Sequence, residues 1–338
     1  MGDELIIDAG TVAYNDEMPE RFLFPFNQLN FLTSGGVFNR LTLLHSRTDE
    51  GKSTLSSQIL CECIKQGYKC FADFGEDDAE EAVLRLYKQF TPYSKDNYIS
   101  KNYVVNGKGT PIYEYYLTKE KFNEAREFFK GKLFLYNIMI TPDIDHIIAG
   151  LDKARAQGCK VGLIDNMENL EYEGDNENKR FKDIAVALRN YAVRYDMHII
   201  IVCHTRKTER EVLLPSIDDV KGSSAVSNCA KNIFCILRVD KMDKTTKAYA
   251  NLKHLVEMNN YDLDTADALI VVQKTKGRQL GMFTLGYSKQ TNSYYECKKI
   301  DPSKDAPEKP VMFVPEAEKV ENVSFGFEEI DVDGELPF

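Results

Sequence analysis

The sequence predicts an α/β protein whose mostly parallel β-sheet is covered by helices on both faces. Apolar runs of strand length alternate with amphipathic stretches of helix length along most of the chain. Several of these apolar runs are continuous, which is typical of strands buried on both faces. A Gly-Lys-Ser motif follows the first such strand and precedes the first long helix. It predicts where the functional site lies.

The first predicted βα unit carries this motif. Leu41–His45 predicts a strand, and apolar residues at helical spacing up to Ile64 predict the helix. The stretch between follows the phosphate-binding pattern G-x-x-x-x-G-K-[ST], except that its first glycine is a serine: Ser46-Arg47-Thr48-Asp49-Glu50-Gly51-Lys52-Ser53-Thr54. We expect this whole loop to bind nucleotide phosphates, with Lys52 at the β- and γ-phosphates and Ser53 as a magnesium ligand. The alternative is an ordinary strand–turn–helix with a chance Gly-Lys-Ser.

The remaining elements follow in chain order. Strands are predicted at Lys69–Phe74, Leu133–Tyr136, Val161–Asp165, His198–Cys203, Ile233–Leu237, Ala268–Gln273, Met282–Tyr287 and Ser293–Glu296, the last two as a hairpin. Helices are predicted from about residue 79 to Phe90 and at Lys119–Phe129, Asp143–Gln157 and Phe181–Tyr195. Residues 92–118, rich in Tyr, Asn, Gly and Lys, are expected to be irregular. We divide the chain into an N-terminal packing segment (1–35), a central domain (36–300) and an acidic tail (301–338).

Composition and charge exclude several classes of protein. The 338 residues are 43% hydrophobic and 28% charged, which is ordinary for a globular protein. A net charge of −10 argues against a protein that coats nucleic acid with its whole surface, although a local basic loop remains compatible with it. We find neither a secretory signal nor a membrane span. Eight scattered cysteines without a C-x-x-C pair predict reduced thiols in the cytoplasm and no zinc site.

Three side chains at predicted strand ends are candidates for phosphoryl-transfer chemistry. Asp165 ends an apolar strand, where a carboxylate can hold magnesium; capping of the next helix is its alternative role. Glu76 follows the neighbouring strand and is our candidate for polarising the attacking water. Its acidic neighbours leave a solvated turn as the alternative. His204 ends the strand after Asp165, where it would sense a γ-phosphate unless its role is structural.

The order of these segments resembles the RecA-like ATPase domain of DnaB-type hexameric replicative helicases, including Twinkle and the phage helicase–primases. The resemblance covers roughly residues 20–298. Five segments carry it: the phosphate loop, Glu76 with Glu80, Leu163–Leu170, Cys203–Lys207 and Lys274–Tyr287. It implies a RecA-like P-loop core that binds ATP (or another NTP) and Mg²⁺ and forms a hexameric ring on single-stranded DNA. It also implies that His204 is the γ-phosphate sensor.

The fifth segment resembles K-x-R-x-G-x-x-G-x-x-x-L-x-F, whose basic residues reach the neighbouring subunit's nucleotide. Lys274 keeps its place, Lys276 stands where the family has arginine, and Arg278 stands where it has glycine. Because lysine cannot form the bidentate contact of a guanidinium, Arg278 is our candidate finger alongside the two lysines.

The stretch Asp218–Ala225 resembles the family loop that grips the DNA backbone. This resemblance implies DNA contacts by Lys221, Gly222, Ser223 and Ser224, which offer donors to phosphates without reading bases. An ordinary solvent loop is the alternative.

We therefore expect an ATP-dependent, ring-forming motor on single-stranded DNA, most simply a DnaB-type replicative helicase of a bacterium or a phage. We expect the chain to act without the N-terminal primase or helix-bundle domain that family members usually carry. Two alternatives stay open: an ATP-switched recombination mediator or loader that holds DNA without translocating, and an ATPase ring that only scaffolds other proteins.

The tail is expected to be disordered, because from about Pro302 it is rich in proline and acids. Its end, Asp331-Val332-Asp333-Gly334-Glu335-Leu336-Pro337-Phe338, resembles the acidic tip of bacterial single-stranded DNA-binding proteins. That resemblance implies docking on replication proteins. A solubilising tail and a tail that folds back onto the Lys221 loop are the alternatives.

Overall fold

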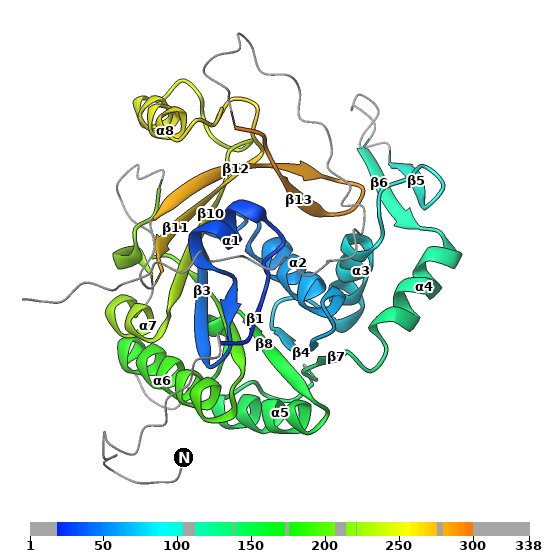
Figure 1. The fold of residues 1–338 in the computed structure, drawn as a ribbon, viewed down its shortest axis with the longest axis vertical. Coiled ribbons are helices and arrows are strands. Elements are labelled where there is room, and N and C mark those ends of the chain that lie inside the picture. Colours follow the sequence, from blue (N-terminus) through cyan, green and yellow to red (C-terminus); the bar gives the residue numbers. More distant parts are fainter. Residues whose placement is uncertain are drawn as a thin grey trace, which may run out of the picture.

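The computed structural model describes residues 19–103, 112–137, 139–172, 176–206, 214–220, 222–275 and 280–299. The acidic tail, Lys221, Lys276 and Arg278 lie outside the described residues. Most strands form one nine-stranded sheet in the order β13-β12-β11-β10-β3-β9-β8-β4-β7 (Figure 1).

Six strands of this sheet run parallel to one another, and the other three form an antiparallel extension. The parallel strands are β10 (Asn232–Arg238), β3 (Arg40–Ser46), β9 (His198–His204), β8 (Cys159–Asp165), β4 (Lys69–Phe74) and β7 (Leu133–Leu135). The antiparallel extension is β11 (Ala268–Lys274), β12 (Gly281–Ser288) and β13 (Ser293–Glu296). The α/β fold class is confirmed, and the sheet is mixed. Parallel register aligns Ser46 with His204 and Phe74 with Asp165, so the predicted site residues share one edge.

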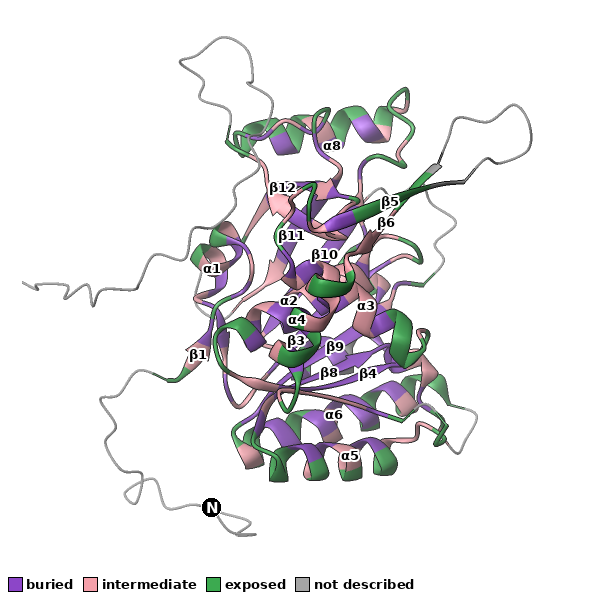
Figure 2. Cartoon of the chain, turned by 90° about the vertical axis from the view of Figure 1, so that its right-hand side faces the viewer, coloured by how far each residue is buried: buried purple, intermediate pink, exposed green. Residues whose placement is uncertain are grey.

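Helices cover both faces of the parallel part of the sheet. Figure 2 shows the buried strands β4, β8 and β9 between α5 (Ile144–Ala156) and α6 (Glu177–Tyr195) on one side and α2 (Lys52–Lys65) and α3 (Ala79–Phe90) on the other. Successive side chains of β8 point to opposite faces of the sheet and therefore pack against different helices. Leu163 belongs to the core cluster of α2, whereas Ile164 belongs to that of α6. This two-sided burial explains the continuous apolar runs.

The N-terminal segment packs against the core of its own chain. It contains β1 (Arg21–Phe22), α1 (Asn27–Thr33) and β2 (Gly36–Val37). The ring of Phe22 is fully buried and meets His198 edge-on, with ring centroids 5.0 Å apart. A Cβ at Gly36 would lie 2.1 Å from the same ring, so only glycine fits there.

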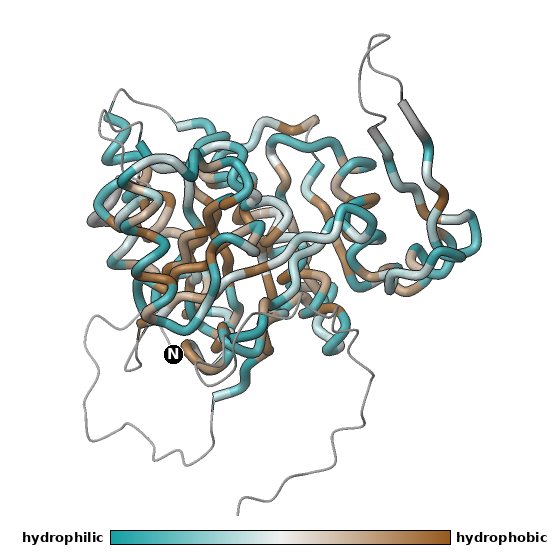
Figure 3. The backbone as a smooth tube through the Cα atoms, turned by 90° about the horizontal axis from the view of Figure 1, so that it is seen from above, coloured by the Kyte–Doolittle hydropathy of each residue, from teal (hydrophilic) through white to brown (hydrophobic). Residues whose placement is uncertain are grey.

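The expectation that residues 92–118 are irregular is wrong. Strands β5 (Tyr98–Tyr103) and β6 (Ile112–Leu117) pair as an antiparallel hairpin beside α4 (Lys119–Phe129), and Figure 3 shows the two strands extending away from the main sheet. The alternation of apolar and polar residues that predicts a strand is obscured here, because the hairpin has many tyrosines and lysines and few aliphatic residues. The Tyr98 hydroxyl, for example, donates to the carbonyls of Lys88 and Thr91.

The sequence also did not predict the helices α7 (Ser223–Cys229) and α8 (Lys247–Met258). Within the part of the chain that the structure describes, no helix is long and apolar enough to cross a membrane.

Candidate nucleotide-binding and catalytic site

The stretch between β3 and α2 forms a tight loop with two left-handed residues. Asp49 has φ 61° and Gly51, the N-cap of α2, has φ 87°. The first N–H groups of an α-helix have no intrahelical partner, so the start of α2 suits an anion bound in this loop. The C-terminal half of the chain fixes this loop from outside. The Glu50 carboxylate accepts the N–H of Arg238, and Lys241 Nζ donates to the carbonyl of Asp49 at 2.8 Å.

Lys52 lies inside the loop, with only 5% of its surface exposed. Its Nζ donates to the carbonyl of Arg47 at 2.7 Å and lies 3.1 Å from Nδ1 of His204. Burial lowers the pKa of Lys52, and the nearby carboxylates, Asp165 foremost, oppose that shift. The ammonium is therefore a desolvated cation at the place where phosphate would sit.

Asp165 is 5% exposed and accepts a hydrogen bond from Ser56 Oγ at 2.9 Å. Burial raises the pKa of Asp165 despite hydrogen bonds from Ser56 and Ser53. The helix-cap alternative is wrong, because Asn166 caps the following turn at Asn169. A serine hydroxyl beside a carboxylate offers the oxygen donors that Mg²⁺ prefers, so the residues present fit this ion. No cluster of three or more His, Cys, Asp or Glu side chains suited to a metal occurs among the described residues.

Glu76 lies at the mouth of this site, with its side chain 60% exposed and Oε1 3.5 Å from His204 Nε2. Its acidic neighbours are engaged elsewhere. Asp77 pairs with Arg85, while Asp78 caps α3 at the N–H of Glu81. Of the acids in this turn, Glu76 is thus the one that faces His204.

Two more residues complete the cluster: Asn166, which the sequence did not single out, and Glu168, which is the alternative to Glu76 as the catalytic carboxylate. Asn166 Oδ1 accepts the N–H of Asn169, which fixes the amide so that Nδ2 faces Glu76 Oε1 at 2.6 Å and His204 Nε2 at 3.1 Å. Glu168 Oε1 accepts the N–H of His204 at 2.7 Å. Both lie in the segment that ends with Leu170, but no motif assigns them a role. Their position just after a strand end was the only signal.

The predicted DNA-binding residues lie apart from this cluster, beyond the end of β9. Residue 205 follows His204 and forms a β-bridge with Val220, and the N–H of Arg206 donates to the carbonyl of Asp219 at 2.7 Å. Gly222 has φ 66°, and a Cβ there would lie 2.4 Å from that of Phe181. Ser223 begins α7, so only part of the expected loop is a loop. The side chains of residues 223–225 are outside the described set.

Lys274, the first residue of the predicted finger segment, points back into its own chain. It ends β11, and its Nζ donates to the carbonyl of Ser227 in α7 at 2.6 Å. Of the three finger candidates, it is the one whose contacts the structure describes.

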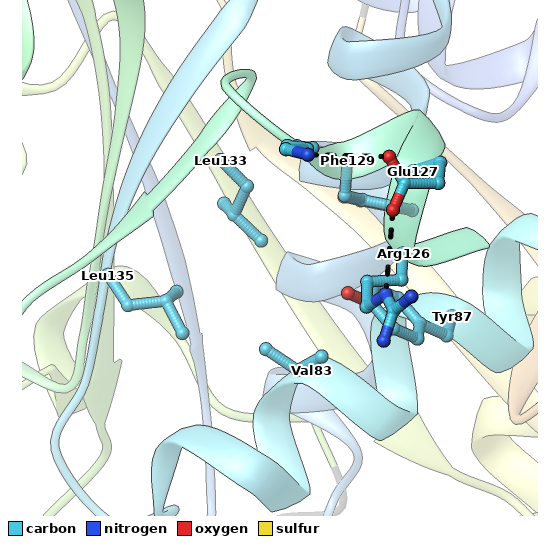
Figure 4. A pocket seen from close by; sticks show the side chains of 8 residues that line it. Val83, Tyr87, Arg126, Glu127, Phe129, Leu133 and Leu135 are labelled. Carbon is cyan, nitrogen blue, oxygen red and sulfur yellow. Dashed lines mark ion pairs between the residues drawn. The ribbon is translucent and has the colours of Figure 1, made fainter. Parts of the chain in front are cut away.

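A cavity of about 520 Å³ lies away from this edge, between α3, α4 and β7. Figure 4 shows Val83 and Tyr87 of α3 facing Leu133 and Leu135, with Arg126 and Glu127 forming an ion pair at the rim. None of the predicted site residues lines it.

Comparisons with known proteins show the family and the fold of the chain. The family model described as the DnaB-like helicase C-terminal domain matches residues 24–296. No curated protein sequence matches the chain. Among solved structures, one described as an ATPase domain gives a TM-score of 0.61 at 14% identity, covering 81% of this chain and 90% of that one.

Two further structures share the fold. A DnaB-like replicative helicase, described with its interactions with primase, gives a TM-score of 0.63 at 14% identity. The match covers 84% of this chain but 65% of that helicase. A KaiC-like protein from the hyperthermophilic archaeon Pyrococcus horikoshii gives 0.53 at 10% identity, covering 83% of this chain and 100% of that one. These matches confirm the RecA-like fold expected from the sequence.

Proposed function

The chain belongs to the family of DnaB-like helicase C-terminal domains, and from this premise we propose that it is an ATP-driven, ring-forming motor that moves on single-stranded DNA. The observation that carries the proposal is the group of side chains at the sheet edge. Lys52, Glu76 and His204 come from separate parts of the chain and are linked by hydrogen bonds or short contacts, directly or through Asn166, and the charge of Asp165 acts on Lys52.

Each residue has a role that its position supports. Lys52 and the loop's N–H groups bind the phosphates, while Ser53 and Asp165 hold Mg²⁺, which would offset charge on the transferring phosphoryl group. Glu76 orients the attacking water from the solvent side of the cluster. His204 reports the γ-phosphate, since its ring touches the same ammonium that the phosphate would contact.

The route from nucleotide to DNA is short. The residue after His204 is bridged to Val220, one position before Lys221. A change at His204 on phosphate binding therefore reaches the base of the predicted DNA segment directly. Lys221, Gly222, Ser223 and Ser224 hold the DNA backbone in this proposal.

The assembly and its location complete the proposal. Six copies form a ring in which Arg278, with Lys276, reaches the neighbouring subunit's phosphates. The acidic tip at Phe338 docks on replication proteins.

We place the protein in the cytoplasm of a bacterium. This bacterium either encodes the protein itself or is the host of a phage that encodes it. The cysteines support a reducing compartment, since seven of the eight are free and buried.

ATP hydrolysis measured with and without single-stranded DNA, together with particle images of the same sample, tests this proposal. We expect DNA-stimulated hydrolysis by closed rings. Hydrolysis by monomers that DNA does not affect would contradict it.

A further inference from the structure

The last two residues of β11 hold the two flanks of the predicted DNA-binding segment. Gln273 Nε2 donates to the carbonyl of Pro215 at 2.6 Å, before that segment. Lys274 Nζ donates to the carbonyl of Ser227 at 2.6 Å, after it. The end of a sheet strand thus binds the backbone on both sides of residues 218–224.

Gln273 is also bonded to the strand that leads into the phosphate loop. His45 is fully buried on β3, directly before Ser46, and its Nε2 lies 2.6 Å from Gln273 Oε1. The carbonyl of Pro215 can only accept, so the Gln273 nitrogen must face it and the Gln273 oxygen must accept from His45. This fixes the imidazole as the tautomer with hydrogen on Nε2.

The hydrogen-bonded path is buried at its centre. Burial lowers the pKa of His45 to about 4, so its ring stays neutral near pH 7. The groups that face it are Gln273 and, at longer range, Asp219 and Lys52. His45 Nδ1 has no hydrogen-bond partner among the described atoms. Because breaking a hydrogen bond on this path would leave a buried polar group without a partner, the linked groups favour moving together.

We propose that His45 and Gln273 are positioning residues that couple nucleotide binding at the phosphate loop to DNA binding at the segment flanked by Pro215 and Ser227. This rests on the proposed function, and it adds a second connection to the one through His204. A shift of β3 on phosphate binding would move His45, then Gln273, then the backbone of Pro215. Coupling of this kind is reciprocal, so bound DNA would raise nucleotide affinity by the same factor.

The affinity for single-stranded DNA, measured with and without a non-hydrolysable ATP analogue, tests this proposal. The ratio of the two dissociation constants is the coupling factor, typically about 5- to 150-fold where two sites are linked. In Gln273→Met, which keeps the side-chain length but removes both hydrogen bonds, we expect this factor to fall toward one. DNA affinity without nucleotide is measured in the same titration, so that a loss of coupling is distinguished from a change in basal affinity.

His45→Leu is the second variant, because it breaks the path at its other bond and fills the space with apolar atoms. His198 supplies the matched control. It is equally buried in the same sheet, its Nε2 lies 3.0 Å from Thr42 Oγ1, and its pKa is likewise lowered to about 4 by burial. No described contact joins it to Gln273 or Pro215. His198→Leu should lower thermal stability yet keep the wild-type coupling factor.

The outcomes separate the two claims. Wild-type coupling in both Gln273→Met and His45→Leu overturns the coupling path, as does an equal loss in the His198→Leu control. If instead the wild-type protein binds no single-stranded DNA, the proposed function itself fails. Stability and nucleotide affinity of each variant are measured alongside, so that a fold defect is recognised directly.

Discussion

His204 lies between two hydrogen-bond donors, an arrangement that ties its imidazole to phosphate binding. Lys52 Nζ is 3.1 Å from Nδ1, and Asn166 Nδ2 is 3.1 Å from Nε2. A neutral imidazole can accept at one nitrogen only, so both contacts cannot be full hydrogen bonds at once. A phosphate that draws the ammonium of Lys52 toward itself would leave Asn166 as the donor to the ring. His204 is thereby poised to change partners when nucleotide enters.

Replacing Glu76 tests the assignment of the catalytic carboxylate. Glu76→Gln should still bind nucleotide, because the phosphate loop is intact, but turnover should fall by roughly 10²-fold or more, as expected for loss of a positioned base. Steady-state kinetics and a nucleotide-binding titration check this. Glu168→Gln is the matched variant, since Glu168 bonds the backbone of His204. A larger loss of turnover in Glu168→Gln than in Glu76→Gln would reverse the assignment.

A second buried carboxyl, Asp73, lies on β4 and gives a pH-dependent prediction. It is 1% exposed and its Oδ2 has no described partner. Burial, reinforced by Asp165, raises the pKa of Asp73 to about 7, from 3.8 for the free side chain. Because the folded-state pKa is the higher one, the native state loses stability as pH rises from about 4 through 7.

Asp73→Asn removes this titration. Its stability relative to wild type should therefore improve by about 2–4 kcal/mol between pH 4 and pH 8, most of it below pH 7. Urea unfolding of both proteins at the two pH values measures the difference. A gap between the variant and the wild type that does not change with pH would contradict the account.

At the scale of elements, the hairpin of β12 and β13 packs against the phosphate loop and the helix that follows it. The side-chain amide of Gln58 on α2 exchanges two hydrogen bonds with the backbone of Tyr294 on β13, at 2.8 and 2.9 Å. The Tyr294 hydroxyl would lie 2.0 Å from a Cβ placed on Gly51. The loop therefore needs glycine for two reasons, a left-handed backbone and this close approach.

These two reasons can be separated by mutation. Gly51→Ala should lose nucleotide affinity at least tenfold, because the left-handed backbone alone costs an alanine about 1–2 kcal/mol and the hydroxyl adds a collision. Gly51→Ala combined with Tyr294→Phe should recover part of the affinity, since the nearest atom is gone while the strain remains. Nucleotide titration and thermal unfolding of both variants check this. Equal affinities in the single and double variants would show that the hydroxyl does not matter.

The elements differ in how far the sequence could predict them. Strands buried on both faces, such as β8 and β9, are predicted by their continuous apolar runs. The β5–β6 hairpin is not predicted in this way, because several of its cross-strand pairs contain polar residues, such as Lys101 with Glu114. Strand ends also predicted that Asp165 and His204 lie at the same end of the parallel strands. The roles of Asn166 and Glu168 arise from contacts across strands, and no spacing in the chain encodes those.

At the scale of the whole molecule, the proposed sites form between subunits, and this can be tested by mixing. Lys52→Ala and Arg278→Ala subunits are each expected to be inactive alone. Mixed rings should regain part of the hydrolysis rate, because some interfaces then combine two intact halves. Differently labelled subunits confirm that the rings have exchanged. Persistent inactivity at every mixing ratio in exchanged rings would count against shared sites.

The central claim is that ATP hydrolysis drives movement along single-stranded DNA. Strand displacement on a forked duplex with a single-stranded tail tests it most directly, with Lys52→Ala as the matched inactive protein. We predict that the wild type releases the second strand only in the presence of hydrolysable ATP, and that Lys52→Ala releases none. ATP-dependent DNA binding with stimulated hydrolysis but no displaced strand would contradict the claim and identify a non-translocating mediator instead.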